Sequence, residues 1–265
     1  MKLDIEMVRD NLENSLISEL KYYDSITSTN ELALDIKDSL VKECMVIIAG
    51  EQTKGRGRLK RNWFSPQYQG LWMSIILLPG QKYKNKLSLL TLIGALSVHE
   101  AIKKMGINST LKWPNDILYE SKKVCGVLSQ FKSVGDKINR VVVGIGVNVN
   151  QKEFDDELKG SSVSLRMIKD KKINKEKLLI EILNNFSIYY GLFKKQQFNN
   201  IIKKWKNEMD MLNKNITINS LDGKKHRGKV IDITQSGELK LKLDSGKNKT
   251  FIAGDVSIDK KFLKY

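Results

Sequence analysis

The chain has 265 residues, of which 41% are hydrophobic and 29% charged, proportions that are ordinary for a globular protein and exclude a disordered one. Its formal charge of +16 indicates acidic ligands or partners, although 39 of the 46 basic residues are lysines scattered along the sequence, as on a solvated surface. There is no apolar signal segment and no apolar run of about 18 residues, so we expect neither a membrane span nor export. Cys44 and Cys125 lie far apart in apolar runs, which predicts reduced thiols and a cytoplasmic protein.

Two helices are predicted before the first long loop. Apolar residues recur at helical spacing over residues 5–20. Further on, Ser28 and Glu31 have the three-residue spacing of a capping box, in which each side chain bonds to the backbone of the other residue. This pair predicts the start of a helix over residues 31–40.

Apolar runs predict a sheet covered by helices. A long helix from Leu87 to Met105 is expected to end at Gly106, and residues 174–206 read as two more helices. Four apolar runs, residues 110–113, 116–120, 123–131 and 138–149, are separated by short turn signals and predict an antiparallel meander. The fold class is therefore α+β, with a mixed, largely antiparallel sheet flanked by helices. The runs that predict strands are residues 21–26, 45–50, 71–78, 110–113, 116–120, 123–131 and 138–149.

The pattern changes near residue 211. Short alternating runs follow one another there, broken by Asp-Gly and Ser-Gly turn dipeptides. Several short strands with polar turns favour a small β-barrel. We therefore expect two domains, residues 1–210 and 211–265, the second with strands in the runs 216–221, 228–233, 238–243 and 250–258.

The segment GRGRLKRNW, residues 55–63, is the most unusual stretch of the chain. Only seven arginines occur in the whole sequence, and Arg56, Arg58 and Arg61 stand within six residues of one another. A guanidinium matches the two oxygens of a carboxylate or phosphate with parallel donors. Because Gly55 and Gly57 make the backbone flexible, we expect this loop to become ordered around an anionic ligand. The alternative is a basic surface loop anchored by Trp63.

A second segment, KWPNDILY, begins at Lys112. Trp113 and Pro114 stiffen the chain, since proline fixes φ and biases the preceding residue to extended structure. Lys112 is therefore expected on a rigid platform, where an ammonium can neutralise a carboxylate that attacks a phosphate. Asn115 and Asp116 are also a common turn pair.

Strand glycines mark a third region. Gly126, Gly144 and Gly146 lie inside apolar runs, where glycine is poor β structure unless a ligand or another part of the chain passes close by. No metal site is legible, because His99 and His226 have no second ligand at a useful spacing. His99 is interpreted as helix packing.

Taken in order, STN, EQTKGRGRLKRNW, KWPND, KKVCGVL and GIGVNVN resemble the biotin protein ligase family. The resemblance runs from about residue 21 to the C-terminus. It implies a catalytic domain like that of class II synthetases, followed by an SH3-like β-barrel. It also implies ATP-dependent transfer of biotin, through biotinyl-5'-AMP and with Mg²⁺, to a lysine of a biotin carboxyl carrier domain.

The resemblance assigns residues to both substrates. Lys112 and Arg58 are the catalytic candidates. ATP and the adenylate are expected to contact Lys112 and Arg58 together with Arg61, Trp63, Asn115 and Asn148. Biotin is expected to contact Lys112 and Arg58 together with Ser28, Thr29, Asn30, Gln52, Gly55, Arg56, Gly57 and Gly126.

Three departures from the family pattern stand out. Lys60 replaces a frequent glycine, Gln130 replaces a frequent acid, and about 20 residues precede STN, too few for a winged helix-turn-helix. We therefore expect a cytoplasmic, homodimeric ligase that binds neither specific DNA nor a membrane. The alternatives are a lipoate protein ligase, which shares the fold and chemistry, and a basic nucleic-acid-binding module, which the few aromatics of the last strands disfavour.

Overall fold

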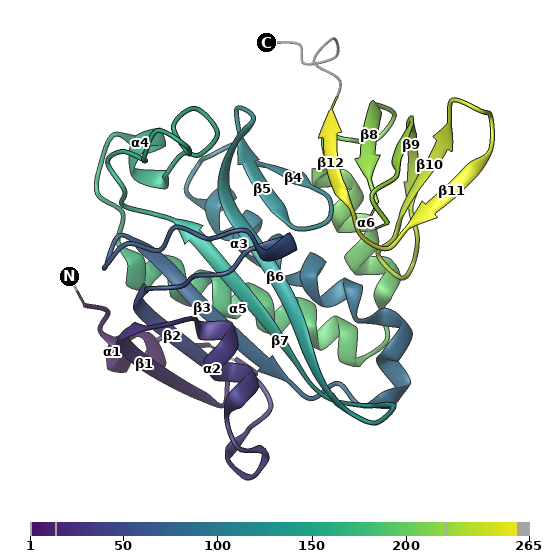
Figure 1. The fold of residues 1–265 in the computed structure, drawn as a ribbon. Coiled ribbons are helices and arrows are strands. Elements are labelled where there is room, and N and C mark those ends of the chain that lie inside the picture. The colour runs from purple at the N-terminus through teal and green to yellow at the C-terminus, as the bar shows by residue number, and fades with distance from the viewer. Residues whose placement is uncertain (1, 14, 221, 259–265) are drawn as a thin grey trace.

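A computed structural model describes residues 2–13, 15–220 and 222–258. They form a large sheet with the strand order β1-β2-β3-β7-β6-β5-β4 and a second sheet with the order β11-β10-β9-β8-β12 (Figure 1). In the large sheet β1 and β2 are parallel, whereas the other neighbours are antiparallel. The strands are β1 (Glu19–Ile26), β2 (Met45–Gln52), β3 (Gly70–Leu77), β4 (Thr110–Lys112), β5 (Asp116–Tyr119), β6 (Lys122–Val134) and β7 (Lys137–Asn148).

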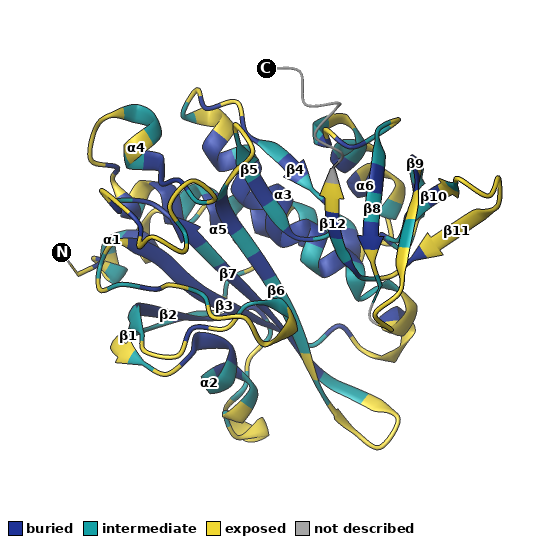
Figure 2. Cartoon of the chain, turned by 45° about the horizontal axis from the view of Figure 1, so that its top comes forward, coloured by how far each residue is buried: buried dark blue, intermediate teal, exposed yellow. Residues whose placement is uncertain are grey.

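Helices cover both faces of the large sheet. Because side chains alternate along a strand, Val46 and Ile48 of β2 join the core under α3 (Ser88–Lys104) and α5 (Lys175–Lys194). Met45 and Ile47 point the other way and pack with α2 (Thr29–Asp35). The central strands are consequently buried on both sides, as Figure 2 shows in dark blue.

The predicted meander and long helices are confirmed. β4, β5, β6 and β7 pair in sequence order, and α3 is followed by Gly106 in the left-handed conformation with φ 73°. The region 174–206 holds α5 and α6 (Phe198–Glu208). A short helix, α4 (Leu165–Lys169), was not predicted. Among the described residues, no helix combines the length and the apolar composition needed to cross a bilayer.

The helix predicted over residues 5–20 is wrong beyond its first turns. α1 spans Ile5–Asp10, and Leu20 belongs to β1. The intervening segment docks on α5, because the backbone N–H of Leu16 donates to the Ser187 hydroxyl, 3.1 Å away. Parallel pairing of β1 with β2 then fixes the following residues as a strand. Tertiary contacts thus outweigh the apolar spacing.

The capping box is also wrong. Ser28 is the N-cap residue of α2 by position, but its side chain makes no capping hydrogen bond. Glu31 pairs with Arg56 of the arginine loop instead. The helix ends at Asp35, and a 3₁₀ turn, η1 (Asp38–Leu40), follows.

The C-terminal residues form a five-stranded antiparallel sheet. It contains β8 (Asn215–Asn219), β9 (Lys225–Ile233), β10 (Leu239–Leu243), β11 (Asn248–Phe251) and β12 (Asp255–Ile258). The run 250–258, predicted as one strand, is two, because β11 pairs with β10 whereas β12 crosses to β8. This crossing places Gly254 and Asp255, where β12 begins, beside Arg58 and Arg61.

Candidate functional site

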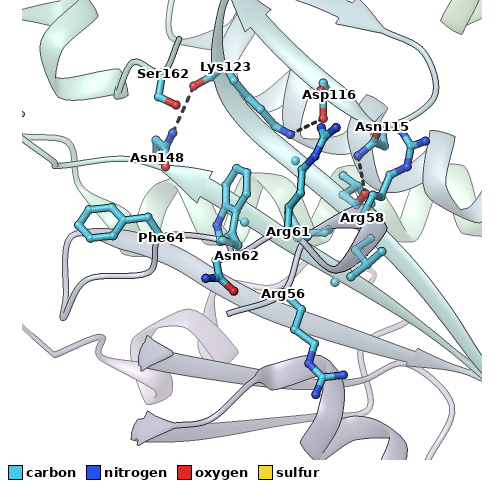
Figure 3. A pocket seen from close by; sticks show the side chains of 18 of the residues that line it. Arg56, Arg58, Arg61, Asn62, Phe64, Asn115, Asp116, Lys123, Asn148 and Ser162 are labelled. Carbon is cyan, nitrogen blue, oxygen red and sulfur yellow. Dashed lines mark hydrogen bonds and ion pairs between the residues drawn. The ribbon is translucent and has the colours of Figure 1, made fainter. Parts of the chain in front are cut away.

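A cavity of about 420 Å³ lies over the sheet face that carries α2. Its walls are the arginine loop, the KWPND turn and the start of β12. Figure 3 shows Arg58 and Arg61 of the loop beside Asn115 and Asp116 of the turn. The volume suits a small-molecule ligand. The predicted site residues that line it are Ser28, Thr29, Asn30, Gln52, Arg56, Gly57, Arg58, Arg61, Trp63, Lys112, Asn115, Gly126 and Asn148.

Gly55 lies outside this lining. Its carbonyl accepts from the Trp63 backbone N–H at 2.9 Å, and a Cβ on Gly55 would come within 2.4 Å of the Trp63 carbonyl oxygen. Glycine is therefore required where the two ends of the loop touch. Gly55 borders a second pocket, which is lined by residues between 51 and 67.

The end of the cavity near α2 is a network of fixed polar groups. Gln52 Oε1 accepts from the backbone N–H of Thr29 at 2.9 Å and from its hydroxyl at 3.0 Å. Asn30 Nδ2 donates to Gln130 Oε1 at 2.8 Å, which gives Gln130 a role as an acceptor. A Cβ on Gly144 would lie 2.1 Å from Asn30 Oδ1, so the glycine makes room for this amide. The network presents oriented donors and acceptors to a neutral polar ligand group.

Arg58 bridges three parts of the chain. Its Nη1 donates to Asn115 Oδ1 at 2.8 Å and its Nη2 to the Gly254 carbonyl at 2.7 Å, while the Asp255 carboxylate lies 3.7 Å away. Burial lowers the pKa of the Arg58 guanidinium, and Asp255 opposes that shift. Arg61 also pairs with Asp255. Asp255 therefore contacts two arginines of the loop.

The indole of Trp63 fills a cradle of two glycines. A Cβ would come within 2.3 Å of its Nε1 at Gly146 and within 3.0 Å of its ring at Gly126. Lys123 Nζ lies over the ring, 5.1 Å from its centre. Trp63 Nε1 is buried and has no hydrogen-bond partner among the described residues.

Strand register aligns the charged groups with this cradle. Lys112 pairs with Asp116, Asp116 with Gly126 and Gly126 with Gly146, and directly opposed residues share one face of a sheet. Burial lowers the pKa of the Lys112 ammonium, and the Asp116 carboxylate opposes that shift. Lys123 Nζ forms a 2.6 Å ion pair with Asp116. Two ammonium groups therefore stand beside one carboxylate.

Asn148 has protein partners on both sides. Its Nδ2 donates to the Lys123 carbonyl at 3.2 Å, and its Oδ1 accepts from Gln151 at 3.1 Å. These bonds fix the C-terminal end of β7 beside Lys123, whose backbone N–H donates to the carbonyl of Ser161 at 2.8 Å, and Ser161 also lines the cavity.

Sequence reasoning missed several lining residues. Lys123 and Asp116 lie within recognised segments, and their charge beside Gly126 and Asn115 was an available signal. Asp255 had none, because it is 194 residues from Arg61 and belongs to another sheet. Phe64, Phe154 and Leu158 supply apolar lining from loops without regular pattern.

A second polar cluster lies outside the cavity. His99 was expected to have no second ligand, yet its Nε2 lies 3.1 Å from Glu208 Oε2 and its Nδ1 2.9 Å from Ser109 Oγ. Lys103 donates to the other Glu208 oxygen at 2.8 Å, and Lys204 lies 3.0 Å from Glu100. The arrangement is an ion-pair network between α3 and α6, in which lysines supply the positive charge.

The cavity combines oriented amides, a glycine-floored slot and a cluster of cations. Three arginines and two lysines face it, with Asp116 and Asp255 as the opposing carboxylates. Such a site can hold a ligand that has a neutral polar end and anionic groups, and it can stabilise negative charge that develops between them.

Comparison with known proteins gives consistent matches. Residues 22–148 match the biotin/lipoate A/B protein ligase family, and residues 211–259 match the biotin protein ligase C-terminal domain. The chain is 33% identical over 256 residues to the bifunctional ligase/repressor BirA of Bacillus subtilis, covering 95% of this chain and 78% of that protein. It resembles the structure of the biotin protein ligase from Aquifex aeolicus in complex with biotin and ATP, with 31% identity and a TM-score of 0.80 over 92% of this chain and 99% of the other.

Proposed function

Since this chain belongs to the biotin protein ligase family, we propose that it attaches biotin to a lysine of a biotin carboxyl carrier domain in two ATP-dependent steps. One observation carries the proposal: five cations from three separate segments converge on a cavity whose other end presents fixed amides. The Aquifex aeolicus enzyme, whose structure holds biotin and ATP, has the same fold.

The first step forms an acyl phosphate. A carboxylate oxygen of biotin attacks the α-phosphorus of ATP, the bond from that phosphorus to the bridging oxygen breaks, and pyrophosphate leaves. In the second step the carrier lysine attacks the acyl carbon, forms an amide and releases AMP and a proton. Both substrates of the first step are anions, so guanidinium and ammonium groups lower its barrier by offsetting their repulsion.

For biotin, the proposed contacts lie around α2. Thr29, Asn30 and Gln52 are held by one another and by Ser74, 2.6 Å from Asn30 Oδ1, so they can meet a ureido group without reorganising. Ser28 is buried at the same end. The biotin carboxylate would then lie toward the cations, near Arg56, Gly57, Arg58, Lys112 and Gly126.

ATP and the adenylate would occupy the other end. Trp63 offers an aromatic ring, and Asn115 and Asn148 border the same space. Arg58, Arg61 and Lys112 would hold the phosphates. We assign the catalytic role to Lys112 and Arg58, because both are half-buried in the cavity wall and a partly desolvated cation acts more strongly on a developing charge.

The cavity also fits the metal that accompanies ATP. Mg²⁺ binds oxygen ligands, typically one or two carboxylates together with phosphate oxygens. Asp116 lies in the lining, where its Oδ1 is paired with Lys123 Nζ at 2.6 Å. This carboxylate would hold the ion, which would supply further neutralisation of phosphate charge.

The proposal extends to partners and setting. The expected protein substrate is a carrier domain, the expected assembly is a homodimer, and no operator DNA is expected to bind. Cys44 and Cys125 are buried thiols, in keeping with the cytoplasm. Sedimentation tests the dimer, and a footprint on a biotin operon promoter would contradict the absence of repressor activity.

Pyrophosphate release tests the central claim. The purified chain is mixed with Mg-ATP and either biotin or lipoate, without a carrier, and the acid-quenched product is identified by mass. Release with biotin and a biotinyl-adenylate product is expected. Release with lipoate alone would change the substrate within the same family, and no release with either compound would refute adenylation.

A further inference from the structure

A turn of the second sheet packs against the KWPND segment and α3. This turn comprises residues 234–238, between β9 and β10. The Gly237 carbonyl accepts from Trp113 Nε1 at 2.9 Å, and the Ser236 carbonyl accepts from the hydroxyl of Ser88, the first residue of α3. Trp113 and Gly237 are both buried. The turn therefore makes a solvent-shielded contact with the residue that follows Lys112.

The 234–238 turn has a fixed shape. The backbone N–H of Gly237 donates to the Thr234 carbonyl at 2.9 Å. Gly237 has a φ of 84°, a conformation that favours glycine. A Cβ there would lie 3.1 Å from Leu92 Cδ1 and 3.2 Å from Leu89 Cδ2 of α3, closer than ordinary contact. A bulky residue at this position would therefore move the turn away from α3.

The strand that carries Lys112 has little pairing of its own. β4 is three residues long and lies at the edge of the large sheet, where it pairs with β5. In addition, Leu111 forms a backbone bridge with Met209, at the end of α6, and Trp113 donates to Gly237. Because short segments with few contacts open most readily, these two contacts contribute to holding β4 in place.

We propose that Trp113 and Gly237 are positioning residues: by accepting the Trp113 N–H, the 234–238 turn fixes the end of β4 and so places Lys112 in the cavity wall. A cation must be aligned with the charge that it stabilises, and a misplacement of about 1 Å can lower a rate by about 100-fold. The chemical role of Lys112 rests on the proposed function, whereas the hold of the turn on Trp113 does not.

Trp113→Phe tests the role of the indole N–H, because it removes this donor and keeps an aromatic ring. It should lower kcat for pyrophosphate release about tenfold and leave the KM for biotin within about twofold, since the proposed biotin contacts around α2 lie on other elements. Trp205→Phe is the matched control. Trp205 is equally buried, but its Nε1 has no hydrogen-bond partner among the described residues. The control should leave kcat unchanged.

Gly237→Val disturbs the same contact from the side of the second sheet. Gly246→Val is its control, because Gly246 has a φ of 83° in the next turn and a Cβ there meets nothing within 4 Å. Both changes strain the backbone, but only Gly237→Val should lower kcat, by about tenfold. Combined with Trp113→Phe, it should add little. Equal kcat values for Gly237→Val and Gly246→Val would overturn the positioning role.

Exchange of the Trp113 indole N–H with deuterium, followed by NMR, tests the hold without an activity assay. The chain has four tryptophans, so the Trp113 resonance is the one that Trp113→Phe removes. Gly237→Val should speed its exchange about tenfold and leave that of Trp205 unchanged. Equal exchange in Gly237→Val and wild type would overturn the link. If the wild type releases no pyrophosphate, the proposed function fails, and the exchange still decides whether the turn holds Trp113.

Discussion

The Trp63 indole rests on Gly146 so closely that a Cβ there would come within 2.3 Å of its Nε1. The nearest atoms belong to a rigid ring system, which cannot bend away as a flexible chain end would. Gly146→Ala should therefore push Trp63 out of its cradle. Overpacking of this kind costs about 1–3 kcal/mol.

We expect Gly146→Ala to raise the KM for ATP in pyrophosphate release by about tenfold. Gly191→Ala is the matched control, because Gly191 lies within α5 and a Cβ there meets nothing within 4 Å. It should stabilise the chain by about 1 kcal/mol and leave the KM unchanged. An unchanged KM in Gly146→Ala would show that Trp63 does not contact ATP.

Lys112→Ala tests the assigned catalytic cation. Its removal should reduce the rate of pyrophosphate release by about 100-fold, as for other groups that stabilise developing charge. Lys123→Ala should also slow the reaction, since its ammonium shares Asp116. Lys122→Ala, one residue earlier and exposed, should not. Near-normal turnover of a folded Lys112→Ala protein, judged by circular dichroism, would refute the assignment.

Lys60 and Leu59 both adopt the left-handed conformation, with φ of 60° and 54°. The frequent glycine at this place in the family has a physical reason, because glycine has no Cβ penalty there. Lys60→Val should destabilise the closed loop by about 1–2 kcal/mol, since a β-branched residue resists positive φ. Lys60→Gly should be nearly neutral.

The measurement is the dissociation rate of preformed biotinyl-adenylate, with release several-fold faster from Lys60→Val and within about twofold of wild type for Lys60→Gly. Equal dissociation rates in all three proteins would show that the left-handed conformation at residue 60 does not control opening of the loop.

The lowered pKa of the Glu208 carboxyl predicts a loss of folding stability in acid. Burial raises the pKa of its carboxyl, but hydrogen bonds from Lys103 and His99 outweigh burial and hold the pKa at about 2. A carboxyl with a depressed pKa contributes stability above its unfolded value of 4.5, and that contribution disappears as the pH falls toward 2. Burial also lowers the pKa of His99, so protonation of this imidazole in acid destabilises the fold in the same direction.

Glu208→Gln should lower the free energy of unfolding at pH 7 by about 3 kcal/mol, and its difference from wild type should shrink between pH 4.5 and 2. Urea titrations of both proteins at several pH values measure this difference in the free energy of unfolding. Glu181→Gln, which removes an exposed pair with Lys104, should cost less than about 1 kcal/mol. A difference that stayed constant with pH would contradict the proposed ion-pair network.

Much of the fold followed from local pattern. Apolar runs bounded by turn signals gave the meander of β4 to β7, and Gly106 marked the end of α3, because strand alternation and helix termination depend on neighbouring residues. The helix over residues 5–20 failed for the opposite reason. Its apolar residues had the right spacing, but Ser187 and the partner strand β2 lie far away in sequence.

By itself, the sequence determined the chemical groups of the site: three arginines beside glycines, a lysine ahead of Trp113 and Pro114, and glycines within two strands. Only the tertiary structure decided what those groups touch. Strand register placed Lys112, Asp116 and the glycines in one row, and the crossing of β12 brought Asp255 to Arg61. Composition and spacing are local properties, whereas an ion pair across 194 residues exists only after both sheets have formed.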